Sequence, residues 1–309
     1  MNHQHPTSIS GKTLLEALDS GADLSSLHRI NLDGCDLTSF PCRILNFAKL
    51  TELSLFDNQL REVPEEVGQL RHLRTLNLGQ NLLETIAESL GSLKQLEMLD
   101  LGHNRLTMLP EKLGILENLV FLYASNNALS SLPSTLEGLS SLRYLNLTDN
   151  QFHALPGWLS RLSNLIELRV YNNALTTLPD EIGALTNLVE LHAQNNQIAA
   201  LPDSVGGLAS LVKLNLQANR LESLPESIGN LIRLTELDLR FNKLSTLPAS
   251  FTRLRSLEYL DLRANALTEL PEDLDRLTSL RKIDLRWNQL ERFPRCLTAL
   301  ENRGCIVYL

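Results

Sequence analysis

The sequence is poor in aromatic residues and has no excess of basic ones. Aromatics make up 5% of its 309 residues, and the formal net charge is −8 at pH 7. Proteins that bind nucleic acid through phosphates, and proteins that adsorb to anionic lipid, need clustered Lys and Arg. No run approaches eighteen apolar residues, so no membrane-spanning helix is expected. The composition therefore favours a partner that is neither nucleic acid nor membrane.

Features of an exported, disulfide-bonded domain are also missing. The first ten residues, MNHQHPTSIS, contain no basic segment followed by an apolar one, as a secretory signal would. Only four cysteines are present, Cys35, Cys42, Cys296 and Cys305. We predict that they are packed, reduced thiols in a cytoplasmic protein. Secretion into a host cell as an effector stays open, because such signals have no clear physical signature.

What the sequence does contain is a regular spacing of proline. Eleven of its twelve prolines lie at position 41 plus a multiple of 23, from Pro41 to Pro294. One member of the series is missing, at Ala87. Chance does not space prolines in this way, so the chain is an array of 23-residue units. The unit with Ala87 is expected to have a looser turn.

Aligned on this period, the units share the pattern L-x-x-L-x-L-x-x-N-x-L-x-x-L-P. One of them reads LTELDLRFNKLSTLPASFTRLRS (residues 234–256). This pattern is that of the leucine-rich repeat. Its L-P-x-x-[IV] ending resembles the intracellular class found in plant Ras-group-related, animal Ras-scaffold and bacterial proteins. The resemblance covers residues 27–302 and implies an α/β solenoid: a horseshoe with a concave parallel β-sheet and short convex helical or 3-10 turns.

Elementary geometry supports the same fold. Leucines at the fourth and sixth positions of a unit point to one side of a strand, and a single unit cannot bury them. Stacked units turn them into a continuous core. The ninth position is Asn in eleven of twelve units, where an amide can satisfy the peptide groups of adjacent turns. In the first unit Cys35 takes this place.

The two ends of the stack need covers. Residues 11–20 (GKTLLEALDS) read as an amphipathic capping helix, and residues 305–309 (CIVYL) as a final strand. We therefore assign 1–26 to an N-terminal tail and capping helix, 27–302 to twelve repeats, and 303–309 to a C-terminal capping strand. No internal linker is evident, and a single domain is expected.

Candidate functional residues lie at the third, fifth and seventh positions, which face outward on the concave side, and at the eighth position on its edge. The central units carry a cluster of large residues there. They are Phe121, Tyr123, Tyr144, Arg169, Tyr171 and His192. Exposed Tyr and Arg typically anchor protein interfaces, which predicts a partner site. The alternative is that these aromatics suit strand positions and pack on one another.

The last units carry two charged columns. The fifth position runs Asp238, Asp261, Asp284, and the seventh runs Arg240, Arg263, Arg286. Like charges on neighbouring strands repel, so we predict Asp–Arg pairing across adjacent units. A second, smaller hydrophobic patch for a partner is predicted around these columns, formed by Tyr259 and Trp287 with Phe241 and Ala264.

No arrangement of residues indicates catalysis, a metal or a cofactor. The seven histidines fall mostly at different positions of different units, and no H-E-x-x-H or C-x-x-C pair occurs. The leading hypothesis is a non-enzymatic scaffold, monomeric alone, that binds another protein on its concave face. The alternative is the recognition arm of a bacterial effector or kinase signalling system whose catalytic part is on another chain. An enzyme in its own right is the third and least supported hypothesis.

Overall fold

A computed structural model describes residues 11–20, 26–292 and 294–309 of the chain. Residues 1–10 and 21–25 of the segment assigned to the N-terminal tail and capping helix lie outside the described residues. The chain divides into two compact units, residues 1–142 and 143–309. The division falls at the start of the sixth repeat.

The first unit begins with helix α1 (Gly11–Asp19), at the place where the capping helix is predicted. Five three-residue strands follow. They are β1 (Arg29–Asn31), β2 (Glu52–Ser54), β3 (Thr75–Asn77), β4 (Met98–Asp100) and β5 (Phe121–Tyr123). Between them lie 3-10 turns: η1 (Cys42–Asn46), η2 (Glu65–Gln69), η3 (Glu88–Ser92), η4 (Glu111–Ile115) and η5 (Ser134–Gly138).

The second unit holds eight strands and ends in the capping strand. The strands are β6 (Tyr144–Asn146), β7 (Glu167–Arg169), β8 (Glu190–His192), β9 (Lys213–Asn215), β10 (Glu236–Asp238), β11 (Tyr259–Asp261), β12 (Lys282–Asp284) and β13 (Ile306–Tyr308). The turns are η6 (Gly157–Arg161), η7 (Ile182–Ala184), η8 (Asp203–Gly207), η9 (Glu226–Asn230), η10 (Ala249–Arg253) and η11 (Leu274–Arg276). In the last repeat an α-helix, α2 (Arg295–Asn302), replaces the 3-10 turn.

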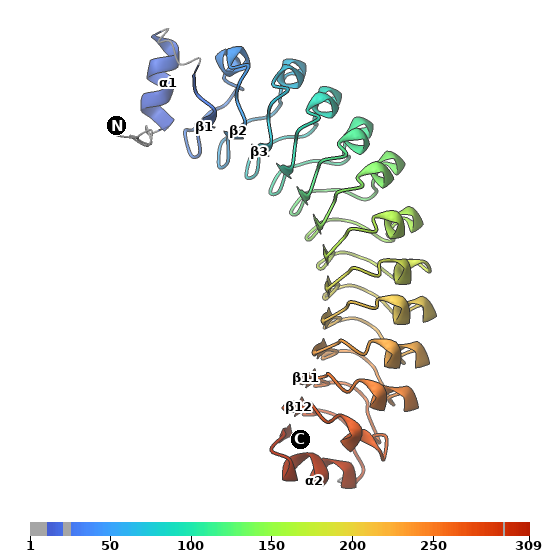
Figure 1. Ribbon diagram of the computed structural model, residues 1–309. Helices are drawn as coiled ribbons and strands as arrows, with labels where there is room; N and C mark the ends of the chain where they lie inside the picture. Colours follow the sequence, from blue (N-terminus) through green and yellow to red (C-terminus); the bar gives the residue numbers. More distant parts are fainter. Residues whose placement is uncertain (1–10, 21–25, 293) are drawn as a thin grey trace, which may run out of the picture. The chain divides into compact units, whose positions relative to one another are not determined.

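Within each unit the strands run parallel to their neighbours and follow the order of the sequence, β1 to β5 in the first unit and β6 to β13 in the second. Each strand residue pairs with the residue at the same position of the next repeat, so that Leu53 pairs with Leu76 and Leu237 with Leu260. Within each unit the strands lie along one side and the turns along the other (Figure 1). In β1 to β11 the middle residue is buried and its two neighbours are exposed or half-buried, in the way that the alternation predicts. In β12 Asp284 is also buried, and in β13 the middle residue, Val307, is half-buried. This confirms the predicted solenoid.

The asparagine column connects consecutive repeats through the backbone. Asn196 is typical: its Nδ2 donates to the carbonyls of Val170, Ala193 and Gln194, and its Oδ1 accepts from the N–H of Leu175. A buried peptide group without a partner costs about 1–3 kcal/mol, so each side chain stabilises its turn strongly. In the first repeat Cys35 takes the place of Asn and cannot make these hydrogen bonds, and Gly11 of α1 packs against its Sγ. The capping helix therefore covers the open end of the column.

The turns explain two further features of the sequence. A Cβ at Gly114 would collide with the carbonyl of Thr135 in the next repeat, so glycine allows close stacking of turns. The prediction of a looser turn at Ala87 is wrong. Ala87 has φ −62° and ψ 136°, close to the −63° and 141° of Pro133, and it begins a turn of the same length. Stacking against neighbouring repeats fixes this conformation without the proline ring.

All four cysteines are free thiols. Cys296 and Cys305 are buried, and burial raises the pKa of both. Cys35 is half-buried, but Cys42 is exposed, so the prediction of packing is wrong for this residue. Within the described part of the chain, no helix is long and apolar enough to cross a bilayer.

Candidate functional site

Three of the predicted central residues come together on the sheet face of the second unit. Tyr144 begins β6, Arg169 ends β7, and His192 ends β8, paired in register with Arg169. The guanidinium carbon of Arg169 lies 5.5 Å from the centre of the Tyr144 ring, in cation–π contact. Arg169 Nε also donates to Glu167 Oε1 at 2.5 Å. Tyr144 and Arg169 thus form one contact surface whose basic group is held in place.

A group of charges surrounds this contact. His192 Nε2 lies 3.0 Å from Glu190 Oε2 and 3.9 Å from Glu167 Oε1. Lys213 Nζ lies 3.9 Å from Glu190 Oε1 on the other side. Burial lowers the pKa of Arg169, but the hydrogen bond to Glu167 outweighs it and leaves the pKa raised, so this guanidinium stays charged. We call Glu167, Arg169, Glu190, His192 and Lys213 the charge web.

The charge web also contains a possible metal-ligand set. Among the described residues one group of three, Glu167, Glu190 and His192, brings its ligand atoms within 4.8 Å of one another. Arg169 already neutralises Glu167, and Lys213 lies beside Glu190, so the geometry is explained by ion pairing. Sequence analysis missed both glutamates. The signal was a pair of carboxylates at the third position of consecutive repeats, beside Arg and His at the fifth.

Other predicted residues are less exposed or lie elsewhere. Tyr171 and Tyr144 are half-buried, not fully exposed as the cluster was pictured. In the first unit, Phe121 and Tyr123 lie at the two ends of β5, paired with Met98 and Asp100. Phe121 is exposed and Tyr123 is half-buried. They form a separate candidate surface in that unit.

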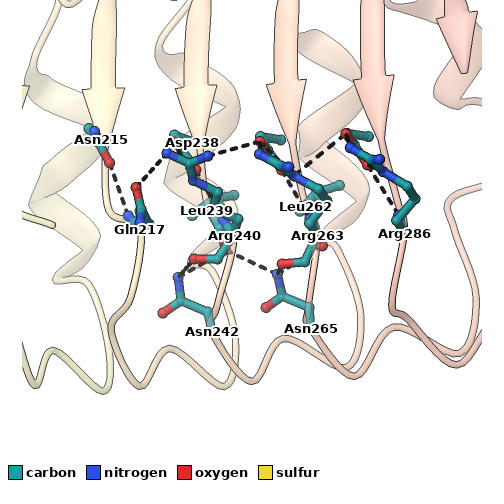
Figure 2. A network of polar contacts seen from close by, with 12 residues as sticks. Asn215, Gln217, Asp238, Leu239, Arg240, Asn242, Leu262, Arg263, Asn265 and Arg286 are labelled. Atoms are coloured by element: carbon teal, nitrogen blue, oxygen red, sulfur yellow. Dashed lines mark hydrogen bonds and ion pairs between the residues drawn. The ribbon is translucent and has the colours of Figure 1, made fainter. Parts of the chain in front are cut away.

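The two charged columns at the C-terminal end form an ion-pair ladder (Figure 2). The shortest contacts are within one repeat: Arg263 Nη2 lies 2.6 Å from Asp261 Oδ2, and Arg286 Nη2 lies 2.7 Å from Asp284 Oδ2. Contacts between repeats are longer, at 3.5 Å from Arg263 to Asp284 and 4.0 Å from Arg240 to Asp261. The predicted pairing across adjacent repeats is therefore present in these two contacts, and the shorter contacts join the fifth and seventh positions of one repeat.

The ladder is not uniform along its length. Asp284 is buried, which raises the pKa of its carboxyl, but hydrogen bonds from the side chain and backbone of Arg286 outweigh this and leave the pKa below 3.8. For Asp238, burial dominates and leaves the pKa raised above 3.8. Arg240 keeps its Nε 3.1 Å from Asp238 Oδ2, but its Nη2 donates to Gln217 Oε1 at 2.7 Å (Figure 2). Asp238 is thus the less neutralised end.

A shallow hollow of about 260 Å³ lies over the ladder. Asp238, Asp261 and Asp284 form part of its lining, together with Lys213 and Tyr259 from the third position. Tyr259 is exposed. At the edge, the exposed Trp287 ring lies 5.7 Å from the Arg286 guanidinium carbon, which also lies 5.0 Å from the ring of Tyr308. Tyr308 was missed, because the sequence gives no repeat position for the capping strand.

Comparison with known protein families decides what this repeat is. The chain matches the leucine-rich repeat region family over residues 64–170 and 129–219, which together span half of it. Two further leucine-rich repeat families match residues 232–290 and 210–231. The chain belongs to the leucine-rich repeat family. Comparison with curated proteins gave no match.

Several solved leucine-rich repeat structures are similar to this chain. One is the ectodomain of the membrane receptor kinase GASSHO1/SCHENGEN3 from Arabidopsis thaliana, in complex with CASPARIAN STRIP INTEGRITY FACTOR 2. It is 29% identical, with a TM-score of 0.72 over 92% of this chain and 38% of that chain. Another is the Arabidopsis receptor kinase HAESA in complex with the peptide hormone IDA and the co-receptor SERK1. It is 25% identical, with a TM-score of 0.61 over 87% and 60% of the two chains.

An internalin (inlF) from Listeria monocytogenes is similar in fold alone. It is 21% identical, with a TM-score of 0.69 over 95% of this chain and 88% of that chain. The chain spans less than two thirds of the length of the two plant receptors. These likenesses establish the repeat architecture, and the ligands named above are those of the plant proteins.

Proposed function

We propose that this leucine-rich repeat protein is a non-enzymatic scaffold that binds a protein or peptide partner on the exposed face of its sheet. The observation that carries the proposal is the contact of Tyr144 with Arg169, which the charge web holds in place. Side chains already fixed before binding lose little conformational entropy, and Tyr and Arg are the commonest anchors of interfaces. Family members in complexes with peptide or protein ligands support the same function.

Within the second unit, Tyr144, Arg169, Tyr171 and His192 form the centre of the proposed site. The ladder, with Arg240, Tyr259, Arg263, Arg286 and Trp287, is its second contact region. In the first unit Phe121 and Tyr123 form a contact surface of their own. A second candidate function is that of a recognition arm whose catalytic part is on another chain. It is favoured by the two similar structures that come from receptor kinases.

The test begins with affinity capture and crosslinking to obtain a partner, followed by binding measurements on Tyr123→Ala, Tyr144→Ala and Tyr171→Ala. Loss of an interface anchor typically costs about 2 kcal/mol, close to thirtyfold in affinity. We expect such a loss for Tyr144→Ala and Tyr171→Ala, with a melting temperature close to that of the wild type. Tyr259→Ala, on the same face, is the matched control for the second region.

Two results would contradict the central site. Unchanged binding by both variants, with loss in Tyr259→Ala, would move the site to the ladder. A large fall in melting temperature would show that the tyrosines stabilise the fold by packing, as the alternative interpretation holds.

A further inference from the structure

The eighth position of the repeats forms a column of its own along the edge of the sheet face. In the first three repeats of the second unit its residues are polar and bonded to one another. Asn172 Nδ2 donates to Asp149 Oδ1 at 2.7 Å, and Asn195 Nδ2 donates to Asn172 Oδ1 at 2.7 Å. In the next four repeats the column turns apolar. We call these residues the aromatic ledge: Ala218, Phe241, Ala264 and Trp287.

The backbone at this position makes the aromatic residues costly. Phe241 has φ 57° and Trp287 has φ 62°, in the left-handed region that favours Gly, Asn and Asp. The polar residues earlier in the column suit this conformation, whereas a bulky side chain there is an outlier. Stability alone would favour Asn at both places, since Asn accepts this backbone conformation more readily than an aromatic residue.

Packing does not compensate for this cost. Phe241 is 48% exposed and Trp287 is 66% exposed. An exposed aromatic side chain in a strained conformation is explained if it is kept for contact with something else.

The ledge has a defined spacing. Phe241 N donates to Arg263 O at 2.8 Å, and Ala264 N donates to Arg286 O at 3.0 Å, so the strand register continues to this edge. Neighbouring strands are about 4.8 Å apart, which places Phe241 and Trp287 about 10 Å apart with the small Ala264 between them. A group midway lies about 5 Å from each, which is ordinary contact distance for aromatic rings. The three residues thus form a notch for one side chain.

The charge exposed at the Trp287 end of the notch is basic, because Asp284, which pairs with Arg286, exposes only 2% of its side chain. Arg240, Arg263 and Arg286 directly precede the three notch residues in the chain, and each pairs with the Asp two residues before it. Arg286 is the most exposed of the three, at 39% of its side chain. Residues 280–309 also contain six basic and three acidic side chains, in a chain whose net charge is −8. The notch is therefore complementary to an acidic partner.

We propose that Phe241, Ala264 and Trp287 receive one apolar side chain of an acidic protein segment, with carboxylates next to that side chain meeting Arg240 and Arg286. The proposal rests on the proposed function and names its partner chemistry and point of attachment. Because hydrophobic contact and charge both contribute, the segment needs both features.

The test uses the 309-residue chain and a fluorescein-labelled nine-residue peptide with a central Leu flanked on each side by four Asp or Glu residues. Binding is measured by fluorescence anisotropy at two salt concentrations. The variants are Phe241→Asn and Trp287→Asn, which introduce the residue that suits this backbone conformation. Ile232→Asn is the matched control, since Ile232 is 63% exposed and lies outside the ledge.

We expect saturable binding to the wild type that weakens with salt and falls at least tenfold in each notch variant, with the control unchanged. A peptide with central Ala should also bind at least tenfold more weakly. In a Trp158→Phe background, where Trp287 is the only tryptophan, its emission should change on binding. Melting temperatures of the notch variants should equal or exceed that of the wild type.

The proposal is overturned if the peptide does not bind up to millimolar concentration, or if the notch variants or the Ala peptide bind as well as the originals. Failure here is distinct from failure of the proposed function. A captured partner that depends on Tyr144 but not on Trp287 would retain the sheet-face function and remove the notch. Binding at the notch without any effect of Tyr144→Ala or Tyr171→Ala on the partner would retain the notch and remove the central site.

Discussion

The sheet faces of the two units differ, although the framework beneath them is the same. In the first unit many outward positions hold small or uncharged residues such as Ser54, Asn77 and Gly102. In the second unit they hold the charge web and the Asp–Arg ladder. Meanwhile Asn81 in the first unit and Asn219 in the second make the same set of hydrogen bonds.

This contrast separates what builds the fold from what varies on it. Leucines and asparagines face inward or into the turns and satisfy requirements that every repeat shares. Outward positions are free of those requirements, so their residues report on function more than on folding. If the separation is correct, equivalent framework substitutions should lower the free energy of unfolding equally in the two units. Equivalent substitutions at outward positions should have unequal effects.

The largest effect is expected in the asparagine column. Asn81→Ala and Asn219→Ala each leave three carbonyls and one N–H without their side-chain partner in a buried turn. An unsatisfied buried group costs about 1–3 kcal/mol, and partial relaxation limits the total, so we expect a loss of about 3 kcal/mol for each variant. Urea denaturation followed by circular dichroism measures this loss.

Asn172→Ala serves as the control, because this asparagine lies at the half-buried eighth position and bonds only to neighbouring side chains. It should cost less than about 1 kcal/mol. Clearly unequal losses for Asn81→Ala and Asn219→Ala would show that the framework is not equivalent in the two units.

A smaller effect distinguishes the two ends of the ladder by pH. The pKa of Asp284 is lowered in the folded protein, so its ionised form stabilises the fold above pH 3.8, and this contribution is lost as pH falls through the folded pKa. The pKa of Asp238 is raised, so ionisation destabilises the fold as pH rises from 3.8 through the folded pKa. Ionisation of the same residue type, at the same position of two repeats, thus has opposite effects on the stability of the fold.

Asp284→Asn should accordingly destabilise at pH 7, and Asp238→Asn should be neutral or stabilising. Both differences from the wild type should shrink as pH falls below about 4, since the wild-type carboxyls are then protonated as well. Unfolding free energies of the three proteins between pH 3 and pH 7 test this. Equal destabilisation by both variants at pH 7 would mean that Arg240 neutralises Asp238 as fully as Arg286 neutralises Asp284.

The repeat period predicted most of the fold, since Leu53, Asn58 and Pro64 each have one structural role and recur at fixed distances. Spacing cannot predict how outward side chains choose partners. Arg263 reaches the Asp261 of its own strand, and Arg240 divides its contacts between Asp238 and Gln217. These choices depend on side-chain rotamers and burial, which the pattern leaves undetermined.

The candidate site was predicted in part for the same reason. Strand alternation placed Tyr144 and Arg169 on one face correctly. Their contact also involves Glu167, whose only signal was a second carboxylate, Glu190, at the same position of the next repeat. The strained conformation of Phe241 and Trp287 was also missed, although Gly, Asp and Asn at the eighth position of other repeats indicate a positive φ there.

The smallest predicted effect concerns Ala87, where the framework lacks its proline. Its φ of −62° and ψ of 136° already match those of the prolines at this position, and its N–H donates to no backbone group that the structure records. Ala87→Pro therefore removes freedom from the unfolded chain without disturbing the folded one, and should stabilise by about 0.5 kcal/mol. Ser89→Pro is the control: two residues later, the N–H donates to Glu65 Oε2, so the same ring should destabilise. Thermal denaturation of both variants tests this prediction. A lower melting temperature for Ala87→Pro would show that the proline ring disturbs the folded turn although the backbone angles match.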